Sequence, residues 1–334
     1  MAARTSVNLL WSCAVLLISA LATAALIRRL IPLLQRAAVI DVPNARSLHA
    51  APVPRGAGLA IAAVVLAVHA LLLASGRWSG TAPMVITAVA AGFAALGWAD
   101  DRASRGVALR FGVQALLSLV FVCGALPPEV SWPVRALLCL AVMWAVNLFN
   151  FMDGADGLAG VQACAAGLGL SVLLGIEGQG GAALAALAIA GAAVGFLRWN
   201  WHPARIFLGD AGSYFLGFEL AALVTWSAPH ARMPWPALVL VAPFVIDASL
   251  TLTARALRGV PVWRAHREHV YQRLVLSGWS PARLSTALAA LLMLLCWPAA
   301  AVAHAQGPAS ALLVYGLLAI IWTWLRRTLP LSRA

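Results

Sequence analysis

The chain has 334 residues, of which 63% are hydrophobic and only 10% are charged, and its mean hydropathy is +0.90. Soluble globular proteins carry roughly 25% charged residues, so this composition excludes that class and indicates an integral membrane protein in a lipid bilayer. The net charge is +12, and the chain contains arginine but no lysine. No basic stripe interleaved with aromatic residues lies outside the apolar runs, so we expect no nucleic-acid partner.

Apolar runs long enough to cross the hydrocarbon core as helices recur along the chain. They cover residues 7–27, 57–75, 82–99, 109–126, 132–151, 158–176, 181–198, 211–227, 236–256, 283–303 and 309–325. The first run is too long for a signal-peptide core, so we expect a retained span. We predict an all-α, polytopic membrane protein with ten or eleven transmembrane helices. No linker or repeat divides the chain, so residues 1–334 should form a single domain.

Arginine is distributed unevenly between the loops. The loops after the odd-numbered runs hold most of it, as at Arg28 and Arg29 after the first run and at Arg326 and Arg327 after the last. The opposite loops contain only Arg4, Arg77, Arg135 and Arg232. Because cytoplasmic loops carry the excess of positive charge, we predict a cytoplasmic C-terminus and an N-terminus on the opposite side, which is the periplasm in the case of a bacterial inner membrane.

Most of the acidic residues lie on the predicted cytoplasmic side. Those in cytoplasmic loops or at helix ends are Asp41, Asp100, Asp101, Asp153, Asp156, Asp210 and Glu268. Charged groups at a membrane boundary are costly unless they have a role, and clustered titratable groups mark candidate functional sites. We therefore expect a site on the cytoplasmic face.

The loop after the first run contains Arg46 and Arg55 among prolines and glycines. This composition indicates an ordered loop that returns toward the membrane, and guanidinium groups bind phosphate oxygens through paired hydrogen bonds. We predict that both arginines bind a phosphate-bearing substrate. The alternative is the ordinary positive charge of a cytoplasmic loop.

Two adjacent carboxylates, Asp100 and Asp101, end the third run. Neighbouring carboxylates repel each other unless a cation lies near them or a proton is shared. The pair therefore indicates a metal ion or base chemistry. The alternative is a helix end whose acids pair with a local arginine.

The fifth run ends in Asn-Leu-Phe-Asn-Phe-Met-Asp-Gly-Ala-Asp-Gly-Leu, residues 147–158. Asn147 and Asn150 share a face if the helix continues that far. Asp153 and Asp156 repeat the spacing, but the glycine after each predicts a tight turn. Carboxylates on a glycine-rich turn beside amide oxygens suit a divalent cation and a phosphate-bearing ligand. The alternative is a polar loop that only ends the helix.

The loop after the seventh run contains a second acidic motif. Asp210 stands just before a predicted helix, where a carboxylate is a good cap. Capping leaves the surrounding polar and aromatic residues unexplained, namely Asn200, Arg205, Phe207 and Ser213. Phe207 offers a face on which a base can stack, and Asn200 offers amide hydrogen bonds.

The loop after the ninth run holds two histidines, His266 and His269, which share a face if the segment is helical. With Arg267 and Arg273 they would form a cationic cluster suited to a pyrophosphate. The spacing is not the His-Glu-x-x-His of zinc enzymes, so we infer no zinc.

Together these segments resemble the polyprenyl-phosphate N-acetylhexosamine-1-phosphate transferases, relatives of phospho-N-acetylmuramoyl-pentapeptide transferase. The similarity extends from about Asp41 to Arg273. Three motifs carry it: Asp-Asp at 100–101, NxxNxxDGxDGL at 147–158 and GDxGSxxLG at 209–217. The patterns His-Arg-Glu-His-Val-Tyr-Gln and Asp-Val-Pro-Asn-Ala-Arg-Ser are most similar to the O-antigen-initiating branch.

The resemblance implies an enzyme dependent on Mg²⁺, or on Mn²⁺ in its place, that uses a UDP-N-acetylhexosamine. It would transfer N-acetylhexosamine-1-phosphate to undecaprenyl (polyprenyl) phosphate, giving polyprenyl-diphosphate-sugar and UMP. This is the first membrane step of O-antigen, lipopolysaccharide or related cell-envelope glycan synthesis. The implied donor is UDP-QuiNAc or UDP-FucNAc, with UDP-GlcNAc as the alternative, and a homodimer is compatible with the sequence.

The resemblance also implies roles for individual residues. Asp210 and Asn150 would hold the metal ion, and Asp100 would accept the proton of the lipid phosphate. The implied catalytic residues are Asp100, Asp101, Asp153, Asp156, Asp210, His266 and His269. The implied substrate-binding residues are Asn147, Asn150, Gly154, Asn200, Arg205, Phe207, Ser213, Arg46, Arg55 and Arg267.

The resemblance also assigns residues to parts of the donor. Those assigned to the uridine pocket are Asp153, Gly154, Asp156, Asn200 and Phe207. Those assigned to the diphosphate and sugar are His266, Arg267 and His269. Direct attack and a phospho-enzyme on an aspartate both remain open.

The main rival hypothesis is a secondary transporter for an anionic, phosphate-bearing solute. Transporters place their polar groups near the bilayer midplane, at broken helices in paired repeats. Here the acids lie at helix ends on one side, no repeat is visible, and only Glu219 and Asp247 lie deeper in a run. A noncatalytic scaffold would not need so many acidic motifs.

Overall fold

The computed structural model describes residues 9–43, 47–48, 51–103, 105–227, 233–262 and 266–329. Its long helices are α1 (Leu9–Arg36), α2 (Gly58–Ala74), α3 (Thr81–Arg102), α4 (Val107–Gly124), α5 (Trp132–Phe151), α6 (Leu158–Ile176), α7 (Gly180–Asn200), α8 (Gly209–Ser227), α9 (Trp235–Ala256) and α13 (Ala309–Thr328). One further rod is formed end to end by α11 (Pro281–Leu291), the π-helical turn η1 (Leu292–Cys296) and α12 (Trp297–Gln306). The smaller elements are the helix α10 (Val270–Leu276) and the strands β1 (Ile40–Asp41) and β2 (Val53–Pro54).

Each apolar run predicted from the sequence falls on a helix. The ends agree to within about three residues where the chain is described, except that α1 continues to Arg36 whereas the first run was predicted to end at residue 27. The predicted all-α, multi-pass membrane fold is confirmed. In the described part of the chain, nine helices are long and apolar enough to cross a membrane: α1, α3, α4, α5, α6, α7, α9, the α11–η1–α12 rod and α13. The two remaining long helices are not among these nine, because α2 has only 17 residues and α8 carries the charged residues Asp210 and Glu219. The orientation of the bundle in the bilayer stays a prediction.

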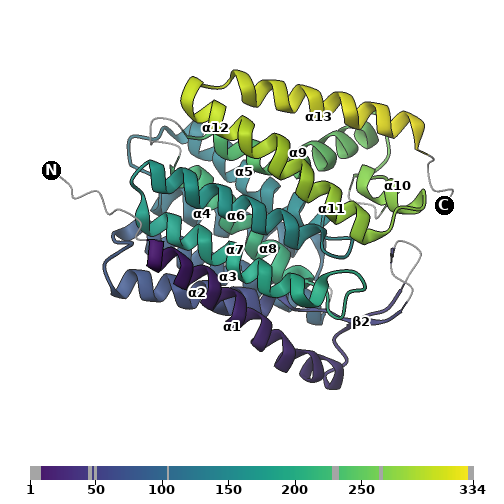
Figure 1. The fold of residues 1–334 in the computed structure, drawn as a ribbon, viewed down its shortest axis with the longest axis horizontal. Coiled ribbons are helices and arrows are strands. Elements are labelled where there is room, and N and C mark those ends of the chain that lie inside the picture. The colour runs from purple at the N-terminus through teal and green to yellow at the C-terminus, as the bar shows by residue number, and fades with distance from the viewer. Residues whose placement is uncertain are drawn as a thin grey trace.

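The centre of the bundle depends on small side chains. α7 is almost entirely buried and packs against α1 and α6 (Figure 1). A Cβ atom at Gly191 would lie 2.4 Å from the carbonyl oxygen of Leu16, and one at Gly195 would lie 2.3 Å from that of Ala20. Small residues let helix backbones approach closely in a membrane, so α1 and α7 touch through their main chains.

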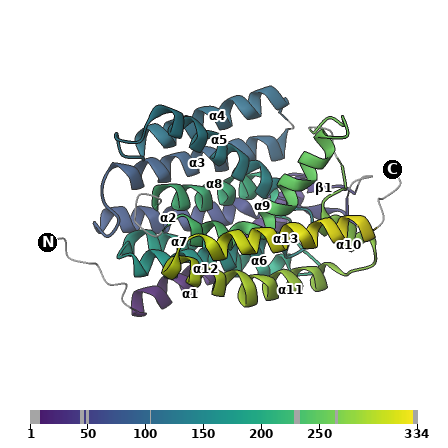
Figure 2. The same ribbon diagram turned by 90° about the horizontal axis from the view of Figure 1, so that it is seen from above.

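The bundle has a layered arrangement around α8. Figure 2 shows α3, α4 and α5 on one side, the helices α11, α12 and α13 on the other, and α8 between them. α8 packs against α2, α3 and α5. Because α8 begins with the predicted acidic motif, its enclosed position fixes where that motif lies.

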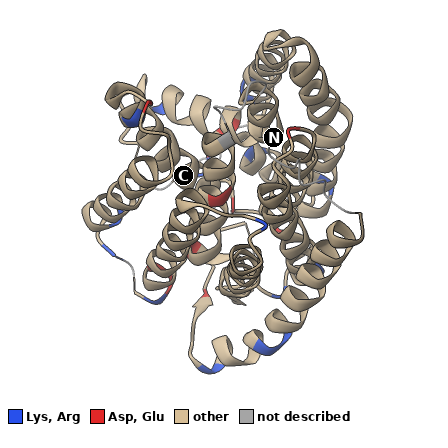
Figure 3. Ribbon diagram, turned by 90° about the vertical axis from the view of Figure 1, so that its left-hand side faces the viewer, with Lys and Arg blue, Asp and Glu red and all other residues tan. Residues whose placement is uncertain are grey.

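One end of the bundle collects the polar segments. β1 pairs antiparallel with β2, and this hairpin lies at the same end as α10 (Figures 1 and 2). Hydrogen bonds join the C-terminal ends of α3 and α5 to the N-terminal end of α8. An end-on view shows how few charged residues interrupt the helices (Figure 3).

Candidate active site

Glycines bring the start of α8 against α2 and α3. A Cβ atom at Gly97 in α3 would lie 2.2 Å from the carbonyl oxygen of Asp210, and one at Gly58 in α2 would lie 2.0 Å from the backbone nitrogen of Gly212. These distances are shorter than any real Cβ contact, so the close approach requires glycine. The acidic end of α3 is thereby placed next to the acidic start of α8.

Asp101 caps α8. Its carboxylate oxygens accept hydrogen bonds from the backbone N–H groups of Asp210 and Ala211, each at 3.0 Å. Gly209 adopts a φ of +77°, and a Cβ there would lie 2.7 Å from Asp101 Oδ2. Arg55 adds an ion pair, with its Nε 3.7 Å from Asp101 Oδ1. The sequence suggested Asp210 as a cap, but Asp101 fills that role and leaves the Asp210 side chain for other contacts.

Asp100 is paired with groups from α4 and α8. It is 5% exposed and accepts hydrogen bonds from Arg110 Nη1 at 2.9 Å, from the N–H of Arg105 at 2.6 Å and from the hydroxyl of Tyr214 at 3.4 Å. Its side chain also contacts that of Asp210.

Asp210 and Asn150 meet as the resemblance implies. The Asn150 amide nitrogen donates to Asp210 Oδ1 at 2.7 Å and to Ser213 Oγ at 2.9 Å. Asn147 does not join them, because its amide nitrogen donates at 2.7 Å to Gln114 on α4. Residues three apart on a helix differ by about 60° in direction, and α5 packs between α4 and α8. The helix does continue through Asn147 and Asn150, but their side chains hydrogen-bond to different neighbouring helices.

The predicted tight turn joins α5 to α6. Tyr271 donates a hydrogen bond to the carbonyl oxygen of Phe151 at 3.0 Å, and a Cβ at Gly154 would lie 2.1 Å from that hydroxyl. Gly154 is therefore needed for the contact with Tyr271. Asp153 is half-buried in this turn. Burial, followed by the charges of Asp210 and Asp101, raises the pKa of Asp153 well above its usual value.

Asn200 joins this turn to the loop before α8. It is 4% exposed, its amide oxygen accepts from the N–H of Gly157 at 2.8 Å, and its amide nitrogen donates to the carbonyl oxygen of Ile206 at 2.9 Å. Both polar ends are thus used inside the protein. Asn200 therefore ties the α5–α6 turn to the loop before α8.

The loop before α8 also contacts the first loop. The N–H of Phe207 donates to the carbonyl oxygen of Pro54 at 2.8 Å, and Phe207 forms a parallel β-bridge with Arg55. Arg205 is exposed and stacks over the ring of Trp199 at 5.9 Å. The structure therefore places Arg55 and Phe207 at the site. Arg46 lies outside the described residues.

The predicted histidine segment packs against the α5–α6 turn. Asp247 in α9 accepts from the N–H groups of Val270 and Tyr271 at 2.9 and 3.1 Å, so it caps α10. His269 is 3% exposed and lies between the rings of Phe151 and Tyr271, with centroids 6.4 and 5.8 Å away. His269 therefore lies beside the turn.

The predicted cationic cluster is only partly cationic. Burial, followed by the charges of His269 and Arg255, lowers the pKa of His266 to about 4, so its ring is neutral near pH 7. Arg273 is 2% exposed and donates to the carbonyl oxygens of Glu268 and Arg326, so it is structural and not available to a pyrophosphate. Glu268 pairs with nearby arginines, namely Arg255, Arg258 and Arg326. Arg267 is half-buried and has no partner among the described residues.

Some contributors escaped sequence reasoning. Arg110 and Tyr214 hold Asp100, and Tyr271 contacts Gly154. Tyr214 follows Asp210 by four residues, so its place on the same helix face was a usable signal. The role of Arg110 depends on how α4 turns after the loop, which spacing does not reveal.

The residues fit a divalent cation bound together with substrate. In the described ranges, no three His, Cys, Asp or Glu side chains form a closed metal site. Mg²⁺ is usually held by one or two carboxylates, waters and substrate phosphates. Asp210 would supply oxygen ligands, and so would the Asn150 amide oxygen, which accepts no hydrogen bond from the described residues. Burial and then the neighbouring carboxylates raise the pKa of Asp153, and a divalent cation beside it would favour its ionised form.

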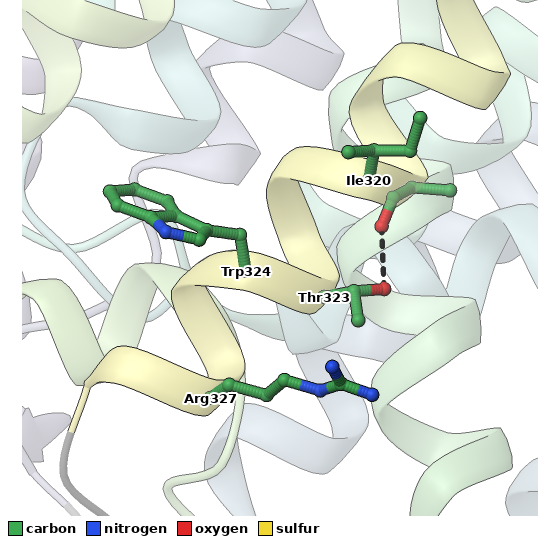
Figure 4. A pocket seen from close by; sticks show the side chains of 5 residues that line it. Ile320, Thr323, Trp324 and Arg327 are labelled. Carbon is green, nitrogen blue, oxygen red and sulfur yellow. Dashed lines mark hydrogen bonds between the residues drawn. The ribbon is translucent and has the colours of Figure 1, made fainter.

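A hollow of about 410 Å³ on the bundle surface is not part of this site (Figure 4). It is lined only by residues of α13: Ala319, Ile320, Thr323, Trp324 and Arg327. Trp and Arg near the end of an apolar helix are typical of the membrane–water interface. We interpret the hollow as lipid-facing surface.

Comparison with known proteins decides the family. Residues 83–228, which include nearly all of α3, the α5–α6 turn and the whole of α8, match the model of glycosyl transferase family 4. A probable undecaprenyl-phosphate N-acetylglucosaminyl 1-phosphate transferase of Bacillus subtilis is 30% identical over 272 residues, covering 75% of this chain and 74% of the relative. The chain belongs to the polyprenyl-phosphate N-acetylhexosamine-1-phosphate transferases.

Two further relatives carry similar names. Decaprenyl-phosphate N-acetylglucosaminephosphotransferase of Mycobacterium tuberculosis is 30% identical over 299 residues, covering 75% of this chain and 72% of the relative. Undecaprenyl-phosphate alpha-N-acetylglucosaminyl 1-phosphate transferase of Escherichia coli is 26% identical over 281 residues, covering 77% and 76%. This member of the transferase family is thus a polyprenyl-phosphate sugar-phosphate transferase with a polyprenyl phosphate acceptor and a sugar-nucleotide donor.

Proposed function

We propose that this transferase moves N-acetylhexosamine-1-phosphate from a UDP-sugar to undecaprenyl phosphate, with Mg²⁺ or Mn²⁺, at the cytoplasmic face of a bacterial inner membrane. The observation that supports it most is the group formed by Asp210, Asn150 and Asp153 at the end of the bundle, where no basic side chain of the described residues faces the carboxylates. The reaction would begin O-antigen, lipopolysaccharide or a related envelope glycan.

The reaction brings together two anionic phosphates. An oxygen of the lipid phosphate attacks the β-phosphorus of the donor, the bond to the α-phosphate oxygen breaks, and UMP leaves. A bound Mg²⁺ would neutralise part of the charge on the donor diphosphate and the lipid phosphate. Asp210 and the Asn150 oxygen would hold it, with Asp153 nearby. Capped by Asp101, the start of α8 keeps Asp210 in a fixed position for that task.

The donor would lie across the two loops that Asn200 ties together. Asp153, Gly154, Asp156 and Phe207 would surround its uridine. The neutral His266 would form hydrogen bonds rather than ion pairs. The charge that meets the diphosphate would come from Arg267, which has no carboxylate partner in the described ranges, and His269 would line the sugar end.

Proton transfer places little demand on the protein. A phosphate monoester has its second pKa near 6, so undecaprenyl phosphate is mostly ionised near pH 7. Asp100 remains our candidate to accept the proton of the lipid phosphate molecules that are still protonated, because its side chain contacts Asp210. Its bonds to Arg110 and Tyr214 also give it a part in fixing α3 against α8. Direct attack and a phospho-aspartate route predict the same products.

The sugar is the finer part of the proposal. The loop patterns favour UDP-QuiNAc or UDP-FucNAc, whereas the names of the relatives favour UDP-GlcNAc. These donors differ in the substituents of the hexose ring and share the UDP group. The enzyme should therefore discriminate among them at the His266–His269 end and bind their uridine alike.

A single assay tests the reaction and the donor. Purified protein is incubated with undecaprenyl phosphate, Mg²⁺ and each UDP-N-acetylhexosamine in turn, and UMP release is measured with EDTA as the control. We expect UMP only when lipid, metal and one donor are all present. Absence of UMP with every donor, from protein shown to be folded, would contradict the proposal and favour transport of an anionic solute.

A further inference from the structure

His202 holds one oxygen of the Asp156 carboxylate. Its Nδ1 lies 2.7 Å from Asp156 Oδ2, and the N–H of Ala204 donates to the same oxygen at 3.1 Å. The side chain of Asp156 is 14% exposed and that of His202 is 39% exposed. The two donors come from the loop before α8, whereas Asp156 belongs to the α5–α6 turn. The pair thus joins two loops that face the candidate donor pocket.

The other carboxylate oxygen of Asp156 is left for a ligand. Oδ1 makes no hydrogen bond to the described residues, and the side chain retains access to solvent. A carboxylate oxygen accepts hydrogen bonds only, so its natural partner is an N–H group. The ring N–H of a uracil base is such a donor.

We infer that His202 is a positioning residue for the nucleotide donor: by holding Asp156 Oδ2, it orients Oδ1 toward the base of the UDP-sugar. The inference rests on the proposed function, because it needs a uridine-containing substrate. Hydrogen bonds to a charged group are stronger than neutral ones, and the short contact fixes the carboxylate more tightly than the Ala204 N–H alone.

The fold of the turn does not depend on His202. Ser285 of α11 donates to the carbonyl oxygen of Asp156 at 2.8 Å, and Asn200 accepts from the N–H of Gly157 at 2.8 Å. Both contacts remain when the histidine side chain is removed. Loss of His202 therefore leaves the carboxylate of Asp156 held by the Ala204 N–H alone, while its main chain stays in place.

A matched control lies at the opposite end of α6. His304 Nε2 is 2.6 Å from Glu177 Oε1, and these side chains are 13% and 18% exposed. This pair has the same chemistry and a similar distance, but α6 separates it from the donor pocket. His304→Ala therefore measures the general effect of losing a histidine–carboxylate pair.

The test separates donor binding from acceptor binding and turnover. KM for the UDP-sugar, KM for undecaprenyl phosphate and kcat are measured for wild type, His202→Ala, His202→Asn and His304→Ala, together with melting temperatures. We expect His202→Ala to raise the donor KM about tenfold, the usual effect of one hydrogen bond to a charged group. Its acceptor KM and kcat should stay within about twofold. His202→Asn should restore most of the donor affinity, because its amide N–H can donate to Asp156.

Three results would overturn the inference. An unchanged donor KM in His202→Ala contradicts it directly. Equal losses in both KM values and kcat with a lower melting temperature, and no rescue by His202→Asn, would make the histidine merely structural. Wild-type protein that is folded but releases no UMP with any donor would refute the proposed function and the inference together, and the wild-type arm distinguishes that case.

Discussion

Two groups of carboxylates meet at the same end of the bundle but have their charge balanced differently. Asp101 and Asp247 each accept two backbone N–H groups from the start of a helix, α8 for the first and α10 for the second. Asp153 and Asp210 have no basic side chain beside them in the described ranges, and only the amide of Asn150 donates to Asp210.

The difference separates residues that build the site from residues that can bind a ligand. A carboxylate at a helix N-terminus is stabilised by the free N–H groups and the helix dipole. A buried carboxylate without such partners is destabilising until a proton or a cation joins it. Asp101 and Asp247 form the capped group, and we expect their substitution to lower the stability of the fold. Asp153 and Asp210 form the open group, and we expect their substitution to lower activity.

The largest expected effect is on turnover. Asp210→Asn removes a charge that the proposed Mg²⁺ needs, so activity should fall more than about 100-fold. The amount of folded protein in the membrane should not fall, because Asp101 still caps α8. UMP release across a range of Mg²⁺ concentrations measures this. Wild-type turnover by the variant at limiting Mg²⁺ would refute the metal assignment.

The next effect concerns the contact that positions Asp210. A Cβ at Gly97 would lie 2.2 Å from the carbonyl oxygen of Asp210, so Gly97→Ala must push α3 and α8 apart. Overpacking of this kind costs about 1–3 kcal/mol, and both melting temperature and activity should fall. Gly112→Ala in α4 is the control, because nothing lies within 4 Å of its Cβ position. Equal melting temperatures for the two variants would show that the approach is not required.

A smaller loss is expected when the cap is weakened. Asp101→Asn keeps one oxygen acceptor for the start of α8 but loses the charge and the ion pair with Arg55. The free energy of unfolding should fall by about 1 kcal/mol. The Mg²⁺ concentration that gives half-maximal activity should change little. A large shift in that concentration with an unchanged melting temperature would place Asp101 in the open group.

The smallest effect is a change in the pH dependence of stability. The pKa of Asp153 is raised above its usual 3.8 in the folded protein, so the folded state holds the proton over a pH range where the unfolded chain has lost it. Stability of the metal-free protein should therefore fall as pH rises through that range. Asp153→Asn should remove this slope and raise the melting temperature at pH 7 in EDTA. A steeper fall with pH in the variant would contradict the assignment.

Much of the fold was readable from composition and run length. Each apolar run lies on a helix because only helices satisfy the backbone inside a bilayer. The acidic motifs also meet at one end, since they follow runs that leave the membrane on the same side. Run length and hydropathy did not show that α2 and α8 differ from the other helices. In α8, the enclosure by neighbouring helices allows polar residues such as Asp210 and Glu219, and the sequence does not show that enclosure.

The errors within the site have tertiary causes. Asp210 was the natural cap by position, yet Asp101 caps α8 because Gly97 brings α3 against it. Asn147 and Asn150 face different helices because α5 lies between α4 and α8. The neutral state of His266 follows from burial and nearby charges. Spacing along the chain contains none of this information.

Metal binding is the most direct test of the difference between the two groups of acids. Mn²⁺ is titrated into wild type, Asp210→Asn and Asp101→Asn in the presence of a UDP-sugar, and the free ion is measured by electron paramagnetic resonance. We expect Asp210→Asn to weaken Mn²⁺ binding at least about 100-fold and Asp101→Asn to retain it within about tenfold. Wild-type affinity in Asp210→Asn would contradict our assignment of the metal site to the open carboxylates.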